Sequence, residues 1–176
     1  CRYCGHSISI RYTAVEALTG GLALLLWYRV AHPVFARTSP LEPFPVAAVA
    51  VPFVLYFAFI ALLVAITFVD LEHYIIPHVL TVPGMVLGLA TPWAFRLTFG
   101  DQYLGVVAEL WPPVTPWESI LGWLVGGLLV IAIFYLYLAA RGVAGLGGGD
   151  VTLMAMIGAW LGWPALIFVL FASSLQ

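Results

Sequence analysis

The 176-residue sequence is 64% hydrophobic and only 8% charged, and its mean hydropathy is +1.09, whereas soluble domains carry about 25% charged residues. This composition excludes an ordinary soluble globular domain. Six arginines, no lysine and a formal net charge of −2 leave no basic surface to neutralise a phosphate backbone, so nucleic-acid binding is excluded as well. The composition predicts an all-α polytopic membrane protein embedded in a lipid bilayer.

Long stretches without charged side chains predict the membrane-crossing helices, because one crossing needs about 20 predominantly apolar residues. The expected helices cover residues 14–31, 46–69, 75–95, 117–140 and 151–163, and an apolar piece at 164–176 is too short to cross. We therefore expect a bundle of five to six spans. The sequence starts with Cys1 rather than Met, so we expect a fragment truncated at both ends, with residues 1–13 as an aqueous remnant and residues 14–176 as the membrane domain.

Two pairs of glycines at four-residue spacing predict helix-packing faces: Gly84 with Gly88, and Gly122 with Gly126. The six arginines do not orient the chain, because they divide evenly between the two predicted sides of the membrane.

Two carboxylates stand at the ends of predicted spans, where an ionisable group is a functional candidate by default. Asp70 ends a run without charges that starts at Pro43, and Asp150 follows the segment Gly-Leu-Gly-Gly-Gly at 145–149. Two complete spans separate them, and an even number of crossings returns the chain to the same surface. We therefore expect Asp70 and Asp150 at one membrane face, where Gly147 and Gly149 allow backbone and substrate to approach closely.

Each aspartate also has a purely structural interpretation. Asp150 could be the N-cap of a helix that starts at Val151, and Asp70 could be a helix-end residue at the headgroup level. If the two carboxylates are close, they share one proton near neutral pH, as in aspartic proteases. The deprotonated member then activates a water molecule and the protonated member polarises the scissile carbonyl. No serine stands in a Gly-x-Ser-x-Gly elbow, and Glu72, His73 and His78 lack the order of a zinc protease.

Cys1 and Cys4 form a Cys-x-x-Cys pair, which is half of the usual four-ligand structural zinc site. From the residues alone, a thiol pair with a redox role remains an alternative.

Three blocks in this order resemble the type IV prepilin peptidases, which are leader peptidases and N-methyltransferases of the bacterial inner membrane. Residues 1–20 are similar to the second half of the family's tetra-cysteine segment and the motif that follows it. Asp70 and the following Ile76-Pro77 are similar to the family's first catalytic Asp and to the Ile/Leu-Pro-Asp motif that follows it. Residues 147–163 are similar to the Gly-x-Gly-Asp-x-Lys-Leu block and its helix.

The resemblance implies that Asp70 and Asp150 cleave the basic leader of type IV prepilins, or of type II secretion pseudopilins, at the cytoplasmic face. It also implies methylation of the new N-terminus with S-adenosylmethionine, and a structural zinc held in the complete protein by Cys1, Cys4 and a second pair. The hydrophobic helix of the substrate is then expected in the lipid, along grooves lined by Gly84, Gly88 or Gly122.

The sequence departs from the family pattern near the predicted site. His78 stands where an Asp is usual after Pro77, Thr152 stands where a Lys is usual, and Thr13 replaces a Pro. Arg11 and Glu16 are either juxtamembrane polar anchors, which we favour, or contacts for the basic leader.

Two other functions use the same residues. The carboxylates could form a proton or cation relay in a transporter or channel subunit. In a non-catalytic scaffold, both aspartates would be structural caps, and substitution by Asn would change only stability.

Overall fold

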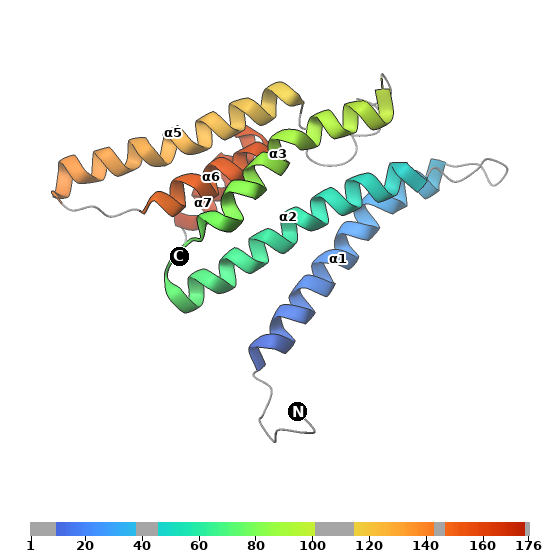
Figure 1. The fold of residues 1–176 in the computed structure, drawn as a ribbon, viewed down its shortest axis with the longest axis horizontal. Helices are drawn as coiled ribbons and strands as arrows, with labels where there is room; N and C mark the ends of the chain where they lie inside the picture. Colours follow the sequence, from blue (N-terminus) through green and yellow to red (C-terminus); the bar gives the residue numbers. More distant parts are fainter. Residues whose placement is uncertain (1–9, 38–45, 101–114, 143–146, 175–176) are drawn as a thin grey trace. The chain divides into compact units, whose positions relative to one another are not determined.

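The computed structural model describes residues 10–37, 46–100, 115–142 and 147–174. Within these residues the chain forms helices and no strand, so the predicted all-α polytopic fold is confirmed. In chain order, and coloured from blue to red in Figure 1, the helices are α1 (Ile10–Arg37), α2 (Val46–His73), α3 (His78–Phe99), α5 (Pro116–Arg141), α6 (Gly148–Leu161) and α7 (Trp163–Ser174).

Four of these helices, α1, α2, α3 and α5, are long and apolar enough to cross a membrane. Helix α6 has 14 residues and α7 has 12, so they are about 21 and 18 Å long, against about 30 Å of hydrocarbon. The span expected at 151–163 therefore begins earlier, at Gly148, and is too short to cross by itself. The final apolar piece forms α7, which is also shorter than a span, as expected.

The chain divides into two compact units, residues 1–64 and residues 65–176. In the first unit, the ring of Trp27 on α1 meets the ring of Phe53 on α2 edge to face, with centroids 5.6 Å apart. The predicted boundary between residues 13 and 14 stays a prediction, because residues 1–9, with Cys1 and Cys4, lie outside the described residues.

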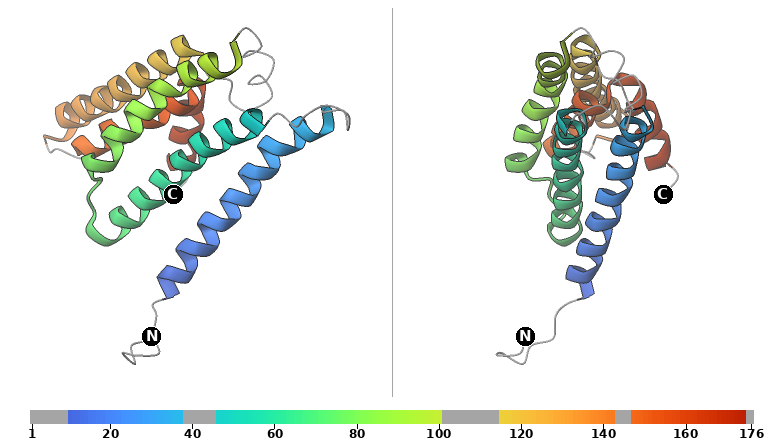
Figure 2. Two further views of the ribbon diagram at one scale, coloured as in Figure 1. Left: turned by 45° about the vertical axis from the view of Figure 1, so that its right-hand side comes forward. Right: turned by 90° about the vertical axis from the view of Figure 1, so that its right-hand side faces the viewer.

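Helix α6 forms the core of the second unit, packed against both α3 and α5 (Figures 1 and 2). Seven consecutive residues of α6, from Met154 to Trp160, are buried. Burial on all sides explains why α6 shows no amphipathic pattern, because a helix surrounded by protein is apolar all round. Two buried side chains link α6 to α3 and α5 through hydrogen bonds. Trp160 Nε1 donates to Gly84 O at 2.7 Å, and Ser119 Oγ donates to Ala159 O at 2.6 Å.

The predicted glycine faces are confirmed, and α6 occupies both of them. A Cβ at Gly122 would overlap the carbonyl oxygen of Gly158, and a Cβ at Gly88 would lie 2.6 Å from the ring of Trp160. These backbones approach as closely as small residues allow in membrane bundles. The expectation that grooves along Gly84, Gly88 or Gly122 take a substrate helix is therefore wrong, because the protein's own α6 fills them.

Candidate active site

Asp70 lies in the last turn of α2, in the second unit. The helix ends because Tyr74 adopts a left-handed backbone conformation, with φ +54°, while its N–H still donates to Asp70 O at 2.8 Å. A bulky residue at positive φ is uncommon and costs conformational energy, and such strain is concentrated at functional sites. The turn continues through Ile75 and Ile76 to Pro77, the N-cap of α3.

Asp150 lies in the first turn of α6, which begins at Gly148 with Gly147 as its N-cap. Asp150 is thus the third residue of the helix, and its interpretation as the N-cap of a helix starting at Val151 is wrong. The carboxylate still has a capping role, because Oδ2 accepts a hydrogen bond from Gly147 N–H at 2.9 Å. Within the described residues, Oδ1 has no hydrogen-bond donor, so this oxygen keeps both lone pairs available for chemistry.

The two aspartates line one cavity of about 400 Å³. Its walls come from the end of α2, the turn that follows it, the start of α3, and the N-cap and first turn of α6. The lining residues are Asp70, Tyr74, Ile75, Ile76, His78, Gly147, Gly148, Gly149 and Asp150. The spans α3 and α5 lie between the two aspartates in the sequence, so this meeting agrees with the even number of crossings. Pro77, which belongs to the family motif after Asp70 and is therefore a candidate support residue of the site, is the N-cap of α3 but does not line the cavity.

Gly149 lets the start of α6 approach the turn after α2. A Cβ at this position would lie 2.7 Å from the Cβ of Ile76 and 3.1 Å from its carbonyl oxygen, which is closer than real Cβ atoms approach a neighbouring carbon. At Gly148, in contrast, an added Cβ has no neighbour within 4 Å. Of these two adjacent glycines, Gly149 is therefore the one that the geometry of the cavity requires.

A hydroxyl network supports His78 at the wall of the cavity. Thr152 Oγ1 donates to Gly149 O at 3.0 Å and accepts from the fully buried Thr81 Oγ1 at 3.0 Å. It also lies 3.2 Å from His78 Nδ1. The Thr152 hydroxyl therefore contacts Gly149, Thr81 and the imidazole at once, and it holds the His78 ring at the wall of the cavity.

Among the residues that line the cavity, none is an arginine or a lysine. The described residues also contain no group of three or more His, Cys, Asp or Glu side chains able to hold a metal ion. Within the part of the chain that the structure describes, the ionisable side chains of the cavity are thus two carboxylates, an imidazole and the phenol of Tyr74. Arg11 and Glu16 lie on α1 in the other unit, and their predicted roles stay predictions.

Three contributors were missed from the sequence. No feature of the sequence predicts the positive φ of Tyr74, since nothing in the residue type favours this conformation. Ile76 was named only as part of a motif, although its close contact with Gly149 is central to the geometry. Thr81 did have a signal, because it is a polar residue in an apolar run, one helical turn after His78.

Comparison with known proteins shows the family to which the chain belongs. The type IV leader peptidase family matches residues 57–176, and the bacterial peptidase A24 N-terminal domain matches residues 1–30. The chain belongs to the type IV leader peptidase family. The matched region contains both aspartates and the whole lining of the cavity, and membership of this family leaves the transporter hypothesis without support.

Curated relatives in this family carry the name prepilin leader peptidase/N-methyltransferase. The protein of Myxococcus xanthus is 35% identical over 100% of this chain and 43% of its own length. The protein of Aeromonas salmonicida is 34% identical over 99% of this chain and 49% of its own length, and that of Dichelobacter nodosus is 28% identical over 99% and 50%. The chain thus spans about half the length of these relatives. No solved structure matches it significantly.

Proposed function

We propose that this chain carries the proteolytic site of a prepilin leader peptidase and that Asp70 and Asp150 are its catalytic pair. The observation that carries the proposal is the shared cavity, in which two aspartates from helices far apart in the sequence meet beside the glycine segment. Membership of the leader peptidase family and the names of the relatives support the reaction type.

The reaction needs two carboxylates that hold one proton between them. The ionised carboxylate takes a proton from a water molecule as this water attacks the scissile carbonyl carbon. The protonated carboxylate donates a hydrogen bond to the carbonyl oxygen and thereby stabilises the negative charge that develops there. Gly147 N–H holds Oδ2 of Asp150. Oδ1 accepts no hydrogen bond from the residues that the structure describes, so this oxygen can share the proton.

The proposed substrate is a prepilin or pseudopilin whose basic leader stays in water while its hydrophobic segment enters the lipid. The cavity suits a cut at the boundary between these two parts, since it is built at the ends of apolar helices from polar side chains and exposed backbone. We place the site at the cytoplasmic face of the bacterial inner membrane, as the family resemblance implies.

Cleavage of a prepilin in membranes that contain the full-length protein tests this proposal. Asp70→Asn and Asp150→Asn keep the size and the hydrogen-bonding capacity of Asp but cannot exchange a proton, so each should lower the rate of leader cleavage at least about 100-fold. Glu72→Gln is the matched control, since Glu72 is a carboxylate in the same last turn of α2 that does not line the cavity; it should cleave at the wild-type rate.

Each alternative outcome has a definite meaning, provided that expression is matched. Cleavage by both Asn variants would show that the aspartic mechanism is wrong and that other groups carry out the cleavage. A wild-type protein that cleaves no pilin-like substrate would overturn the proposed activity itself.

N-methylation and zinc binding belong to the proposal through the family resemblance and the relatives' names. Transfer of labelled methyl groups from S-adenosylmethionine to the newly formed N-terminus tests the first. Cys1 and Cys4 would supply two of the four thiolates of a structural zinc site, and the zinc content of Cys1→Ser and Cys4→Ser variants tests the second.

A further inference from the structure

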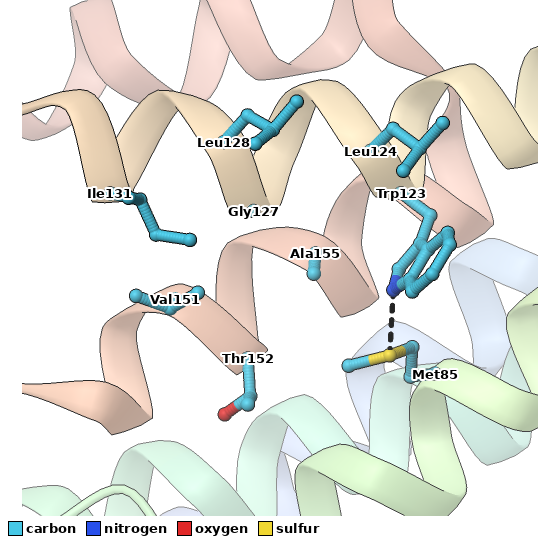
Figure 3. A pocket seen from close by; sticks show the side chains of 9 residues that line it. All are labelled: Met85, Trp123, Leu124, Gly127, Leu128, Ile131, Val151, Thr152 and Ala155. Carbon is cyan, nitrogen blue, oxygen red and sulfur yellow. Dashed lines mark hydrogen bonds between the residues drawn. The ribbon is translucent and has the colours of Figure 1, made fainter.

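A second cavity of about 260 Å³ lies between α3, α5 and α6, within the second unit (Figure 3). Helix α5 contributes one wall, α6 contributes another, and Met85 of α3 closes the cavity opposite α5. Its lining is formed by Met85, Trp123, Leu124, Gly127, Leu128, Ile131, Val151, Thr152 and Ala155.

Small residues that face one another create this space. A Cβ added at Gly127 would meet only the Cβ of Ala155, at an ordinary contact distance of 3.7 Å. One residue earlier, a Cβ at Gly126 would overlap the carbonyl oxygen of Met154. The glycine at 126 is therefore required for helix packing, whereas the glycine at 127 leaves a volume unfilled.

The chemistry of the lining selects an apolar occupant. The indole N–H of Trp123 points at Met85 and donates to its sulfur at 2.8 Å (Figure 3). The hydroxyl of Thr152 is already bonded to Gly149 O and Thr81. The polar groups of the lining thus have partners within the protein, and a polar guest would lose its hydration without replacement.

The cavity adjoins the active site on the side toward the middle of α3 and α5. Val151 and Thr152 directly follow Asp150 on α6, and Thr152 is hydrogen-bonded to His78 of the catalytic cavity. Met85, which closes the second cavity, lies seven residues beyond His78 on α3. At 1.5 Å per residue, Met85 is therefore about 10 Å further along the helix than His78. Leu124, Leu128 and Ile131 are exposed on α5, which leaves the cavity open toward lipid.

We propose that this second cavity is a specificity subsite for one apolar side chain of the substrate, in the segment that follows the cleaved bond. This inference rests on the proposed peptidase function, in which the chain after the cut runs from the polar cavity into the lipid. An extended peptide advances about 3.3 Å per residue. The distance of about 10 Å between the catalytic cavity and Met85 therefore corresponds to three residues, so the bound side chain belongs to one of the first three residues after the cleaved bond.

Filling the cavity from Gly127 tests the subsite, with the full-length protein in lipid vesicles and a panel of prepilin peptides. The panel carries Leu or Ala, one position at a time, at the first three positions after the cut. We expect the wild-type protein to prefer Leu over Ala in kcat/KM at one of these positions, by about tenfold or more. Gly127→Leu should abolish or reverse that preference at this position alone, and Gly127→Ala should reduce it to an intermediate value.

The control is Ala132→Leu, which adds a similar volume to an exposed position of α5 that does not line the cavity; it should keep the wild-type preference. The thermal midpoint reports on folding, and Gly127→Leu should keep it close to the wild-type value because an added Cβ at this position makes only an ordinary contact. An equal loss for every peptide, or no preference in an active wild-type protein, would overturn the subsite while leaving the peptidase activity in place.

The competing occupant is a lipid acyl chain, which has the same apolar chemistry. If the effect of Gly127→Leu follows the acyl-chain length of the vesicles and not the residue in the peptide, the cavity belongs to lipid and the proposal is wrong. If the wild-type protein cleaves no peptide, the peptidase function fails first and the subsite fails with it.

Discussion

The two ends of α6 differ in how closely they are packed. From Met154 to Trp160 every residue is buried, and the helix touches α5 backbone to backbone at Gly122 and Gly158. At the other end, Gly147 and Gly148 are exposed, Asp150 is half-buried, and the segment lines a cavity. One short helix thus combines a closely packed half with an open one.

This contrast shows how a short helix can position a catalytic group. A helix of 14 residues gains little from its own hydrogen bonds and depends on packing for its stability. Here the closed half fixes the axis and rotation of α6 against α3 and α5. Asp150 is consequently held at a defined position beside Asp70 although the open half has few contacts. Substitutions in the closed half should therefore destroy the fold, whereas those in the open half should destroy activity first.

The largest effect is expected for Gly122→Ala in the closed half. The new Cβ would overlap the carbonyl oxygen of Gly158, and backbone atoms cannot move aside as a flexible side chain can. We expect a loss of about 3 kcal/mol or more in the free energy of unfolding, at the upper end for overpacked sites. The yield of monodisperse protein in detergent and its thermal midpoint measure this loss.

Gly20→Ala on α1 is the control, since an added Cβ there has no neighbour within 4 Å, and it should not lower the thermal midpoint. Equal stability of Gly122→Ala and Gly20→Ala would mean that the contact between α5 and α6 does not hold the unit together.

The sequence predicts the main helices and the location of both aspartates at one membrane face, for a simple physical reason. Charged residues are excluded from the hydrocarbon, so Asp70 and Asp150 mark span ends, and the parity of the crossings does not depend on their exact boundaries. The four-residue glycine spacing predicts close packing for a similar reason, because only small residues allow helix backbones to approach.

The sequence does not show which apolar helix is buried by protein and which is surrounded by lipid. In a membrane protein both environments are apolar, so the composition of α6 resembles that of a span although its central residues form the core. This explains why the residues around Gly88 and Gly122 were mistaken for a substrate groove. The strained turn at Tyr74 was missed because its positive φ is imposed by the surrounding structure rather than by the residue itself.

An intermediate effect is expected for Gly149→Ala in the open half. Its Cβ would lie 2.7 Å from the Cβ of Ile76, so the start of α6 must move away from the turn after α2 and separate the two aspartates. Displacement of catalytic groups by about 1 Å costs roughly 100-fold in rate. Leader cleavage should therefore fall by about this factor, while the thermal midpoint stays close to that of the wild-type protein.

Gly148→Ala provides the comparison for this prediction, because it lies in the same segment and an added Cβ meets nothing within 4 Å. It should reduce the cleavage rate much less than Gly149→Ala does. Similar losses in both variants would attribute the effect to backbone flexibility and not to the contact with Ile76.

The smallest of these effects is expected where the two halves meet, at Thr152. Thr152→Val keeps the shape but removes the hydroxyl that links Thr81, His78 and Gly149 O. The buried hydroxyl of Thr81 then loses its partner, which costs about 1–3 kcal/mol in stability, and His78 loses the hydroxyl that orients its ring. Thr152→Ser retains the hydroxyl and should restore both properties.

We expect Thr152→Val to lower kcat more than it raises KM, because a disordered imidazole affects the reacting groups rather than the binding of the hydrophobic segment. Unchanged kcat in a protein of reduced thermal midpoint would restrict the network to a structural role and would separate His78 from the chemistry of the two aspartates.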